Sequence, residues 1–358
     1  MLKPSHLLMV ISLFLFACNT ANRRITTEST SRKAFSFYYN ALTDIEQGYF
    51  SAALSDLDSA IYYQPEYSKF YFVKGRVFEF LHKPDSSINA YEHSVELKSF
   101  YPEAWVRLGE LYLYKRNYVY AATNFKKAIQ SYPDSLGFYL KLGRCYFRLK
   151  KYHLALDRLR DYQQLSRDPS IELKKWQGMV NYGLNEYQKA ADLLQNYIQS
   201  DPNDYEALKY LGFAKFNLKE YNEAMSAFNK ALSLNDKDPE IYLYRARYFI
   251  IRRKRKDALE QLNVGLTFDS LNADILFGLG EFYFEEQKFE KSKNYLSKTV
   301  KINPDYWKAY RYLGFILERE NDLEGALKNY KLFIDNTLVE DSEVRQRIEI
   351  IKDKVMKK

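Results

Sequence analysis

The 358-residue chain has few of the residues from which catalytic and metal sites are built. It contains 2 cysteines and 4 histidines, and the histidines show no spacing that is typical of a zinc site. A phosphate-binding glycine loop, a nucleophile elbow and a pair of carboxylates in apolar surroundings are also missing from the sequence. These absences predict a protein that is not an enzyme and that needs neither a metal ion nor a cofactor.

Backbone-breaking residues and long apolar runs are scarce as well. The 13 glycines and 9 prolines suit helices that are joined by short turns. The longest apolar run lies at the N-terminus and is shorter than the about 20 residues of a stable membrane-spanning helix. A net charge of +8 and a pI near 9.0 are typical of nucleic-acid-binding proteins. Here, however, the basic residues are spread over solvated helix faces. An N-terminal export signal, described below, also argues against nucleic acid as a partner.

Aromatic residues are abundant, with 33 Tyr and 24 Phe, and many of them recur in one pattern. Trp105, Leu108 and Tyr112 are three and four residues apart, which places them on one face of a helix. Ala121 and Phe125 lie on one face of a second helix, after a polar loop. A single helical hairpin cannot bury such faces, whereas stacked copies can.

The pattern repeats at steps of 34 residues. Gly75, Gly109 and Gly143 mark the first helix of three successive copies. After one extra residue the same position is held by Gly178, Gly212, Ala246, Gly280 and Gly314. An alanine recurs as regularly in the second helix, with Ser87 and Ser292 as small replacements. Nine units are predicted to begin near Ala34, Ser68, Pro102, Leu136, Ile171, Tyr205, Pro239, Ala273 and Trp307.

This spacing of small and large residues resembles the tetratricopeptide repeat. The resemblance covers about nine-tenths of the chain and implies an all-α, right-handed superhelical solenoid of about nine helix-turn-helix units. The array is expected over residues 34–338. It is followed at 339–358 by a capping helix with Val344, Ile348, Ile351 and Val355 on one stripe. A partner-binding or membrane-surface helix is the alternative for this last segment.

The N-terminus resembles that of a bacterial lipoprotein. Residues 1–17 are predicted to be a secretory signal peptide, in which Lys3 precedes an apolar run. Leu15, Phe16, Ala17 and Cys18 resemble a lipobox, which implies that Cys18 is acylated and anchors the chain. Residues 18–33 are then a flexible tether. An ordinary cleaved signal peptide and a cytosolic protein with an apolar start are the two alternatives.

The resemblance also implies a peptide-binding groove that is lined by first helices. The residues that match the groove positions of the family are Leu140, Arg144, Phe147, Arg148, Lys175, Met179, Tyr182, Lys209, Phe213, Phe216, Leu243, Arg247, Phe277, Phe284, Arg311 and Phe315. Such a groove would be apolar and aromatic with scattered basic groups, suited to extended or helical segments that carry acidic groups. The alternative is that the aromatic residues wedge between first helices as core.

Two further features have structural explanations. The run from Arg252 to Lys256 lies between two helices and is interpreted as a solvated loop, with anionic headgroups or an acidic partner as the alternative. Cys145 follows Gly143 in a first helix and is interpreted as a small buried hydrophobic residue.

The sequence therefore predicts a non-enzymatic scaffold that is anchored in the cell envelope as an outer-membrane lipoprotein facing the periplasm. Its partners would be segments of envelope proteins and, through the lipid, the membrane; nucleic acid is not expected. The alternatives are a permanent structural subunit of a secretion, motility or outer-membrane assembly complex, and an adaptor for an envelope peptidase or hydrolase.

Overall fold

The structure is a computed structural model that describes residues 29–98, 101–166, 170–337 and 340–356. Within these ranges the chain forms helices and turns, and residues 29–47 make up the first helix. The helices that follow are α2 (Phe50–Tyr63), α3 (Ser68–Phe80), α4 (Pro84–Leu97), α5 (Pro102–Tyr114), α6 (Tyr118–Ser131), α7 (Leu136–Arg148), α8 (Tyr152–Leu165), α9 (Ile171–Gly183), α10 (Tyr187–Ser200), α11 (Tyr205–Asn217), α12 (Tyr221–Leu234), α13 (Pro239–Ile251), α14 (Arg255–Phe268), α15 (Ala273–Glu285), α16 (Phe289–Ile302), α17 (Trp307–Arg319), α18 (Leu323–Asn336) and α19 (Ser342–Met356).

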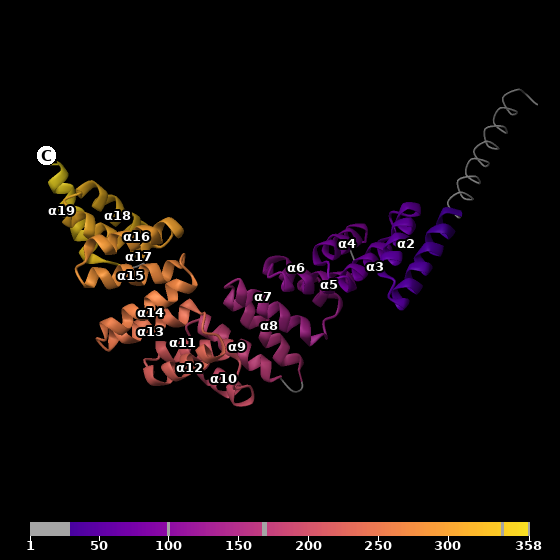
Figure 1. The fold of residues 1–358 in the computed structure, drawn as a ribbon, viewed down its shortest axis with the longest axis horizontal. Helices are drawn as coiled ribbons and strands as arrows, with labels where there is room; N and C mark the ends of the chain where they lie inside the picture. The colour runs from indigo at the N-terminus through magenta and orange to yellow at the C-terminus, as the bar shows by residue number, and fades with distance from the viewer. Residues whose placement is uncertain (1–28, 99–100, 167–169, 338–339, 357–358) are drawn as a thin grey trace, which may run out of the picture. The chain divides into compact units, whose positions relative to one another are not determined.

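The chain divides into two compact bodies, a first body of Met1–Trp176 and a second body of Gln177–Lys358. In the first body α3 packs against α4, α5 against α6 and α7 against α8, as Figure 1 shows. In the second body the antiparallel partners are α11 with α12, α13 with α14, α15 with α16, and α17 with α18. The second helix of a pair also packs on the next pair, as α6 does on α7 and α16 on α17. This confirms the predicted all-α fold of stacked hairpins, and the helix starts are consistent with nine units.

The repeated glycine lets the two helices of a hairpin approach closely. In the second body, a Cβ atom on Gly212 would lie 2.4 Å from the Cε1 atom of Phe228 on the partner helix. In the first body, a Cβ atom on Gly109 would lie 2.8 Å from the Cε1 atom of Phe125. The aromatic ring therefore occupies the space that a side chain would need.

The two serines that replace alanine add a hydrogen bond to this close packing. The Ser87 hydroxyl donates to the backbone carbonyl of Gly75 at 2.8 Å, and the Ser292 hydroxyl donates to that of Gly280 at 2.8 Å. Both serines are fully buried. Their hydroxyl groups are thus hydrogen-bonded inside the hairpin, and their small side chains still let the two helices approach closely.

Each hairpin turn contains one residue in the left-handed region of backbone conformation. These residues have φ between 53° and 65° in eight hairpins, namely at His82, Arg116, Lys150, Asn185, Lys219, Arg253, Gln287 and Asn321, and Gly48 with φ 80° takes this place before α2. At the basic run, the Lys254 amide donates to the Phe249 carbonyl at 2.8 Å and so closes α13. Arg255 begins α14 and pairs with Glu286 at 3.0 Å. Part of the run is therefore helical and paired within the protein.

The C-terminal helix α19 packs on α18 and closes the end of the second body. Val344 and Ile351 are fully buried and Ile348 is nearly so, as the apolar stripe predicts. The side chain of Val355, the fourth residue of that stripe, lies outside the described residues. The helix therefore acts as the predicted cap.

The N-terminal predictions fall largely outside the structure. The signal peptide, Cys18 and the tether up to residue 28 are not among the described residues. Residues 29–33 were expected to belong to the tether, but they are helical and lead directly into the buried Ala34. Among the described residues, no helix is both long and apolar enough to cross a bilayer.

Candidate functional site

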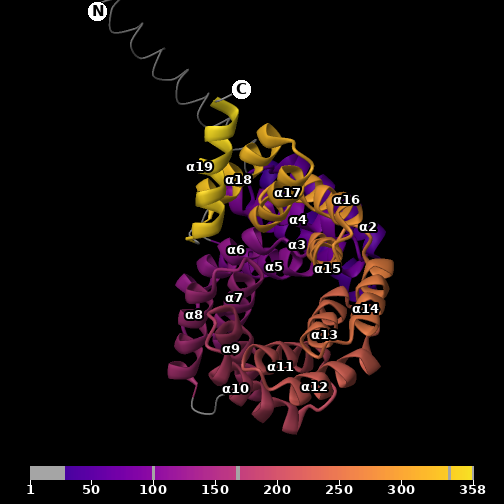
Figure 2. The ribbon, with the colours of Figure 1, turned by 90° about the vertical axis from the view of Figure 1, so that its left-hand side faces the viewer.

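The first helices of the second body lie next to one another and form one of its faces. α11 contacts α13, α13 contacts α15, and α15 contacts α17. Figure 2 shows α12 and α14 on the other side of α11 and α13. Side chains on the exposed side of these first helices are therefore the natural place to look for a binding site.

Tyrosines at the sixth residue of a repeat unit pack on the aromatic ring at the twelfth residue of the preceding unit. The three pairs, with centroid distances of 5.4, 5.0 and 5.0 Å and interplanar angles of 75°, 86° and 75°, are Tyr210 on Tyr182, Tyr244 on Phe216, and Tyr312 on Phe284. We call this series of edge-to-face contacts the tyrosine ladder. It fills the space between successive first helices.

The ladder is interrupted in α15, where the sixth residue of the unit is Gly278. The twelfth residue of the preceding unit is Ile250, which lines a hollow together with Gly278. A hollow of about 300 Å³ opens here, which we call the Gly278 pocket. Its apolar lining is made by Phe216, Leu243, Ala246, Ile250, Ile251, Leu262 and Phe282.

Three charged residues border the Gly278 pocket, and they differ in their partners. Glu281 accepts a hydrogen bond of 2.9 Å from the Tyr312 hydroxyl, and Glu285 pairs with Arg255 at 3.4 Å. Arg247 is exposed and lies over the Tyr244 ring, with its Cζ atom 5.2 Å from the centroid. In the part of the chain that the structure describes, no carboxylate lies within ion-pair distance of Arg247. The pocket thus combines an apolar floor with one available cation.

Burial of Glu281 raises the pKa of its carboxyl. The Tyr312 hydrogen bond and the Arg247 charge act in the opposite direction but do not cancel this effect. Protonation of Glu281, which the raised pKa favours, would remove one negative charge from the border of the pocket.

The predicted groove residue Lys209 forms ion pairs within the second body. Its Nζ atom lies 2.6 Å from Asp238 and 2.5 Å from Glu240. Asp238 caps α13 by accepting from the backbone amide of Ile241, and it also accepts from the Tyr205 hydroxyl. Burial opposes ionisation of Asp238, but the Lys209 charge and these hydrogen bonds outweigh it, so the pKa of the carboxyl is lowered. Lys209 therefore joins two repeat units.

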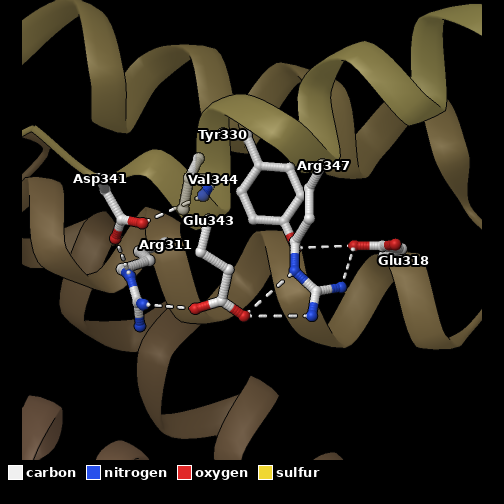
Figure 3. A network of polar contacts seen from close by, with 7 residues as sticks. All are labelled: Arg311, Glu318, Tyr330, Asp341, Glu343, Val344 and Arg347. Carbon is white, nitrogen blue, oxygen red and sulfur yellow. Dashed lines mark hydrogen bonds and ion pairs between the residues drawn. The ribbon is translucent and has the colours of Figure 1, made fainter.

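Arg311 has the same role at the C-terminal end, as Figure 3 shows. Its guanidinium donates to Asp341 at 2.6 Å and to Glu343 at 3.3 Å, where α19 begins. Arg347 of α19 reaches back to Glu318 of α17 at 3.1 Å and lies over the Phe315 ring, 4.6 Å from its centroid. The capping helix therefore covers the predicted groove residues Arg311 and Phe315.

Several other predicted groove residues are buried. These are Leu140, Phe147, Met179, Phe213, Leu243 and Phe277. Phe213, for example, is 4% exposed and packs on Phe228 and Tyr244 at 5.5 and 4.4 Å. The sequence placed it on the groove surface, whereas the structure places it in an aromatic cluster. Tyr182, Phe216 and Phe284 are partly buried members of the tyrosine ladder.

The basic groove residues of the first body gather on one ring. Arg144, Arg148 and Lys175 lie over Trp176, at 4.9, 5.8 and 5.6 Å from its centroid. Arg144 also approaches Glu172 at 3.8 Å. These three cations are thus engaged by the chain itself.

Of the predicted groove residues, the structure brings Phe216, Leu243 and Arg247 together at the Gly278 pocket. The sequence analysis missed Gly278. The available signal was the absence of a tyrosine at the sixth residue of this unit, when the units on both sides have one.

Groups with potential for catalysis or metal binding were also located. Cys145 is fully buried, and burial raises the pKa of its thiol to about 12, so the thiol stays protonated near neutral pH. Within the described residues, no group of three or more His, Cys, Asp and Glu side chains could hold a metal ion.

Comparison with known proteins identifies the repeat. Models of the tetratricopeptide repeat family match residues 106–169, 182–248 and 273–306. Tetratricopeptide repeat protein 21A of Homo sapiens is 39% identical over 54 residues, which are 15% of this chain and 4% of that protein. BBSome complex member BBS4 of Bos taurus is 21% identical over 315 residues, which are 88% of this chain and 60% of that protein. The chain thus spans less than two thirds of either relative.

A solved structure shares the fold. In the crystal structure of the APC/C hetero-tetramer Cut9-Hcn1, a chain with 12% identity aligns with a TM-score of 0.56, covering 94% of this chain and 81% of that one. A tetratricopeptide repeat protein from Parabacteroides merdae ATCC 43184 aligns with a TM-score of 0.49 at 12% identity, covering 66% of this chain and 94% of that one. At such identities, the likeness to the Cut9-Hcn1 chain concerns the fold alone.

Proposed function

This chain is a tetratricopeptide repeat protein, and on that premise we propose that it is a non-enzymatic scaffold that binds segments of other proteins on the first-helix face of its second body. The fold is suited to protein–protein interaction because its stacked helices offer a long continuous surface. The observation that carries the proposal is the Gly278 pocket, where an apolar floor is open to solvent beside the exposed side chain of Arg247.

The size and lining of the Gly278 pocket support a protein ligand over a small-molecule substrate. A volume of about 300 Å³ is at the lower end of the range for ligand pockets and has room for one or two side chains. The border consists of one arginine and two carboxylates that already have partners. Apolar anchors with a polar rim are typical of sites that hold a peptide or a helix.

We further propose that the scaffold is tethered by lipid on Cys18 to the outer membrane and faces the periplasm. The support is the sequence of residues 1–18, in which an apolar run ends in a lipobox-like motif. Several acyl chains on one cysteine would anchor the chain firmly. The bound segments would then belong to proteins of the cell envelope.

A second candidate function is a permanent subunit of an envelope assembly. The exposed side chains of Tyr62 and Tyr114 in the first body favour it, because they are 81% and 78% exposed. Tyrosine is enriched at protein–protein interfaces relative to the rest of the surface. A purified chain that is monodisperse would support the binding module, and one that aggregates without a partner would support the permanent subunit.

The anchor is tested by comparing wild type with Cys18→Ser, with Thr20→Ala as the matched control two residues away. We expect wild type and Thr20→Ala to fractionate with the outer membrane and Cys18→Ser to be released. A pull-down of each from detergent-solubilised cells, read by mass spectrometry, would recover envelope proteins. Unchanged fractionation of Cys18→Ser would contradict the lipid anchor, and recovery of no specific protein by wild type would contradict the scaffold function.

A further inference from the structure

The tyrosine ladder shows what normally fills the position that is empty in the Gly278 pocket. At the units on both sides, a tyrosine ring stands on the twelfth residue of the preceding unit, as Tyr244 does on Phe216 and Tyr312 on Phe284. At Gly278 the equivalent ring is missing, and Ile250 forms part of the wall. The hollow therefore lies at the place that an aromatic side chain holds in the neighbouring units.

The surroundings of this position are suited to a ring. Leu243 and Leu262 lie below it, since their Cδ atoms are each 3.2 Å from where a Cβ atom on Gly278 would be. Phe216, whose ring already has edge-to-face contacts with Tyr221 and Tyr244, lines the same pocket. An aliphatic side chain would fill the hollow less completely than a flat ring.

The charge at the border favours an acidic neighbour for that ring. Glu281 and Glu285 are held by Tyr312 and Arg255, respectively. Arg247 is exposed, and although its charge acts on Glu281, it forms no ion pair within 4 Å of a carboxylate among the residues described. A carboxylate that is brought in by a ligand would pair with Arg247.

We propose that the Gly278 pocket binds an aromatic side chain of a partner segment, while a carboxylate next to that side chain pairs with Arg247. The partner segment thereby restores the step of the tyrosine ladder that the chain itself lacks. This inference rests on the proposed function, because it assigns the chemistry of the segment that the second body binds.

The first test uses small probes that carry the two features separately. In ligand-observed NMR with the purified chain, 3-phenylpropionate supplies a ring and a carboxylate, propionate a carboxylate alone, and 2-phenylethylamine a ring and a cation. We expect 3-phenylpropionate to bind in the millimolar range and at least about tenfold more tightly than either of the others. Equal binding of all three, or binding of none, would overturn the proposal.

The second test fills the pocket from inside. Gly278→Tyr supplies the missing ring of the ladder, and its Cβ atom needs only a small shift of two leucine side-chain ends. The matched control is Gly137→Tyr in α7, where a new Cβ atom meets no atom within 4 Å. Binding of 3-phenylpropionate should be lost in Gly278→Tyr and kept in Gly137→Tyr. Retained binding in a folded Gly278→Tyr variant would place the probe elsewhere and refute the assignment.

The third test reverses the charge and does not depend on filling the pocket. Arg247→Glu should weaken 3-phenylpropionate about fivefold or more, since the pair is exposed and partly screened, and should strengthen 2-phenylethylamine. Arg245→Glu is the control on the same helix, because Arg245 is not among the lining residues. If Arg247→Glu leaves the order of the two probes unchanged, the arginine does not select the ligand and the proposal fails.

The outcomes separate this inference from the proposed function. If the Gly278→Tyr variant recovers the same envelope proteins as wild type, the scaffold function stands and the pocket assignment fails. If wild type recovers no specific protein while the probes behave as expected, the pocket assignment stands and the scaffold function fails.

Discussion

At the scale of single residues, small side chains and buried ion pairs set how closely helices pack. Gly212 leaves room for the Phe228 ring, and Lys209 and Asp238 join neighbouring repeat units. A change of one side chain at either place should therefore lower the free energy of unfolding measurably.

Gly212→Ala should destabilise the protein by about 1 to 3 kcal/mol, although alanine is the better helix former. The new Cβ atom would lie 2.4 Å from Phe228, whose ring is fully buried and packs on Phe213 and Tyr244. Gly137→Ala, in open space, should instead stabilise by up to about 1 kcal/mol. Thermal and urea unfolding would measure both. Equal effects of the two changes would contradict the close approach at Gly212.

Asp238→Asn should lower the free energy of unfolding at pH 7 by about 1.5 to 3 kcal/mol, because a buried charged hydrogen bond to Lys209 is lost. The pKa of Asp238 is lowered in the folded state from its ordinary 3.8. Its ionised form therefore stabilises the fold above pH 3.8, and this contribution disappears as the pH falls through the lower folded-state value. Urea unfolding at pH 7 and near pH 3 should show the difference between wild type and variant shrinking with acidification. A difference that is independent of pH would argue against the ion pair.

At the scale of elements, the hairpin turns hold one residue each in the left-handed region, which is sterically unfavourable for residues other than glycine. Eight turns place a residue other than glycine in the left-handed region, and Gly48 occupies the equivalent place before α2. The capping helix α19 is held to α17 by two arginines, because Arg311 of α17 pairs with Glu343 of α19 and Arg347 of α19 pairs with Glu318 of α17. Its docking covers the last first helix and so leaves less of that surface for ligands.

Lys150→Gly should stabilise the protein by up to about 1 kcal/mol, since glycine adopts the left-handed region without the steric cost of a Cβ atom. Lys150 has φ 57° and precedes α8 in its hairpin turn. Lys150→Val should destabilise, because a branched side chain is unsuited to that conformation. Lys151→Gly is the control, at φ −89°, and should not stabilise. The melting temperatures of the three variants would test these expectations. A Lys150→Val variant that is more stable than wild type would refute the steric cost at this position.

At the scale of the whole molecule, stability is expected to be distributed along the chain. Each hairpin packs mainly on its neighbours in sequence, as α5 does on α4 and α6, or α17 on α16 and α18. In such arrays the free energy is close to a sum of local and nearest-neighbour contributions. Local damage should therefore remain local.

Ala121→Leu should open the hairpin of α5 and α6, because Ala121 is fully buried where the two helices meet and the added bulk costs about 1 to 3 kcal/mol. Hydrogen exchange followed by mass spectrometry should show lower protection in α5, α6 and their neighbours. Protection in α15 to α18 should be unchanged. A uniform loss over both bodies would show that the array unfolds as one cooperative unit.

The sequence alone determined the helical hairpins and the stripe by which α19 packs. Both depend on residues three and four positions apart and on a repeat of 34 residues, so they can be read from local spacing. Cys145 as a buried hydrophobic residue belongs to the same class, because its place in the first-helix pattern predicts its burial.

The roles of the side chains on the first-helix face depend on contacts between repeat units, which local spacing does not specify. Lys209 meets Asp238 and Arg311 meets Asp341, partners about one repeat away in the sequence, and this turns predicted groove cations into connections between units. Phe213 is buried because rings from three different units converge on it. The Gly278 pocket also depends on contacts between units. Gly278 supplies no ring to pack on Ile250 of the preceding unit, and a hollow is left between the two units. Spacing fixes which face a residue lies on, whereas its neighbours across the helix interface determine whether it is core, connection or binding surface.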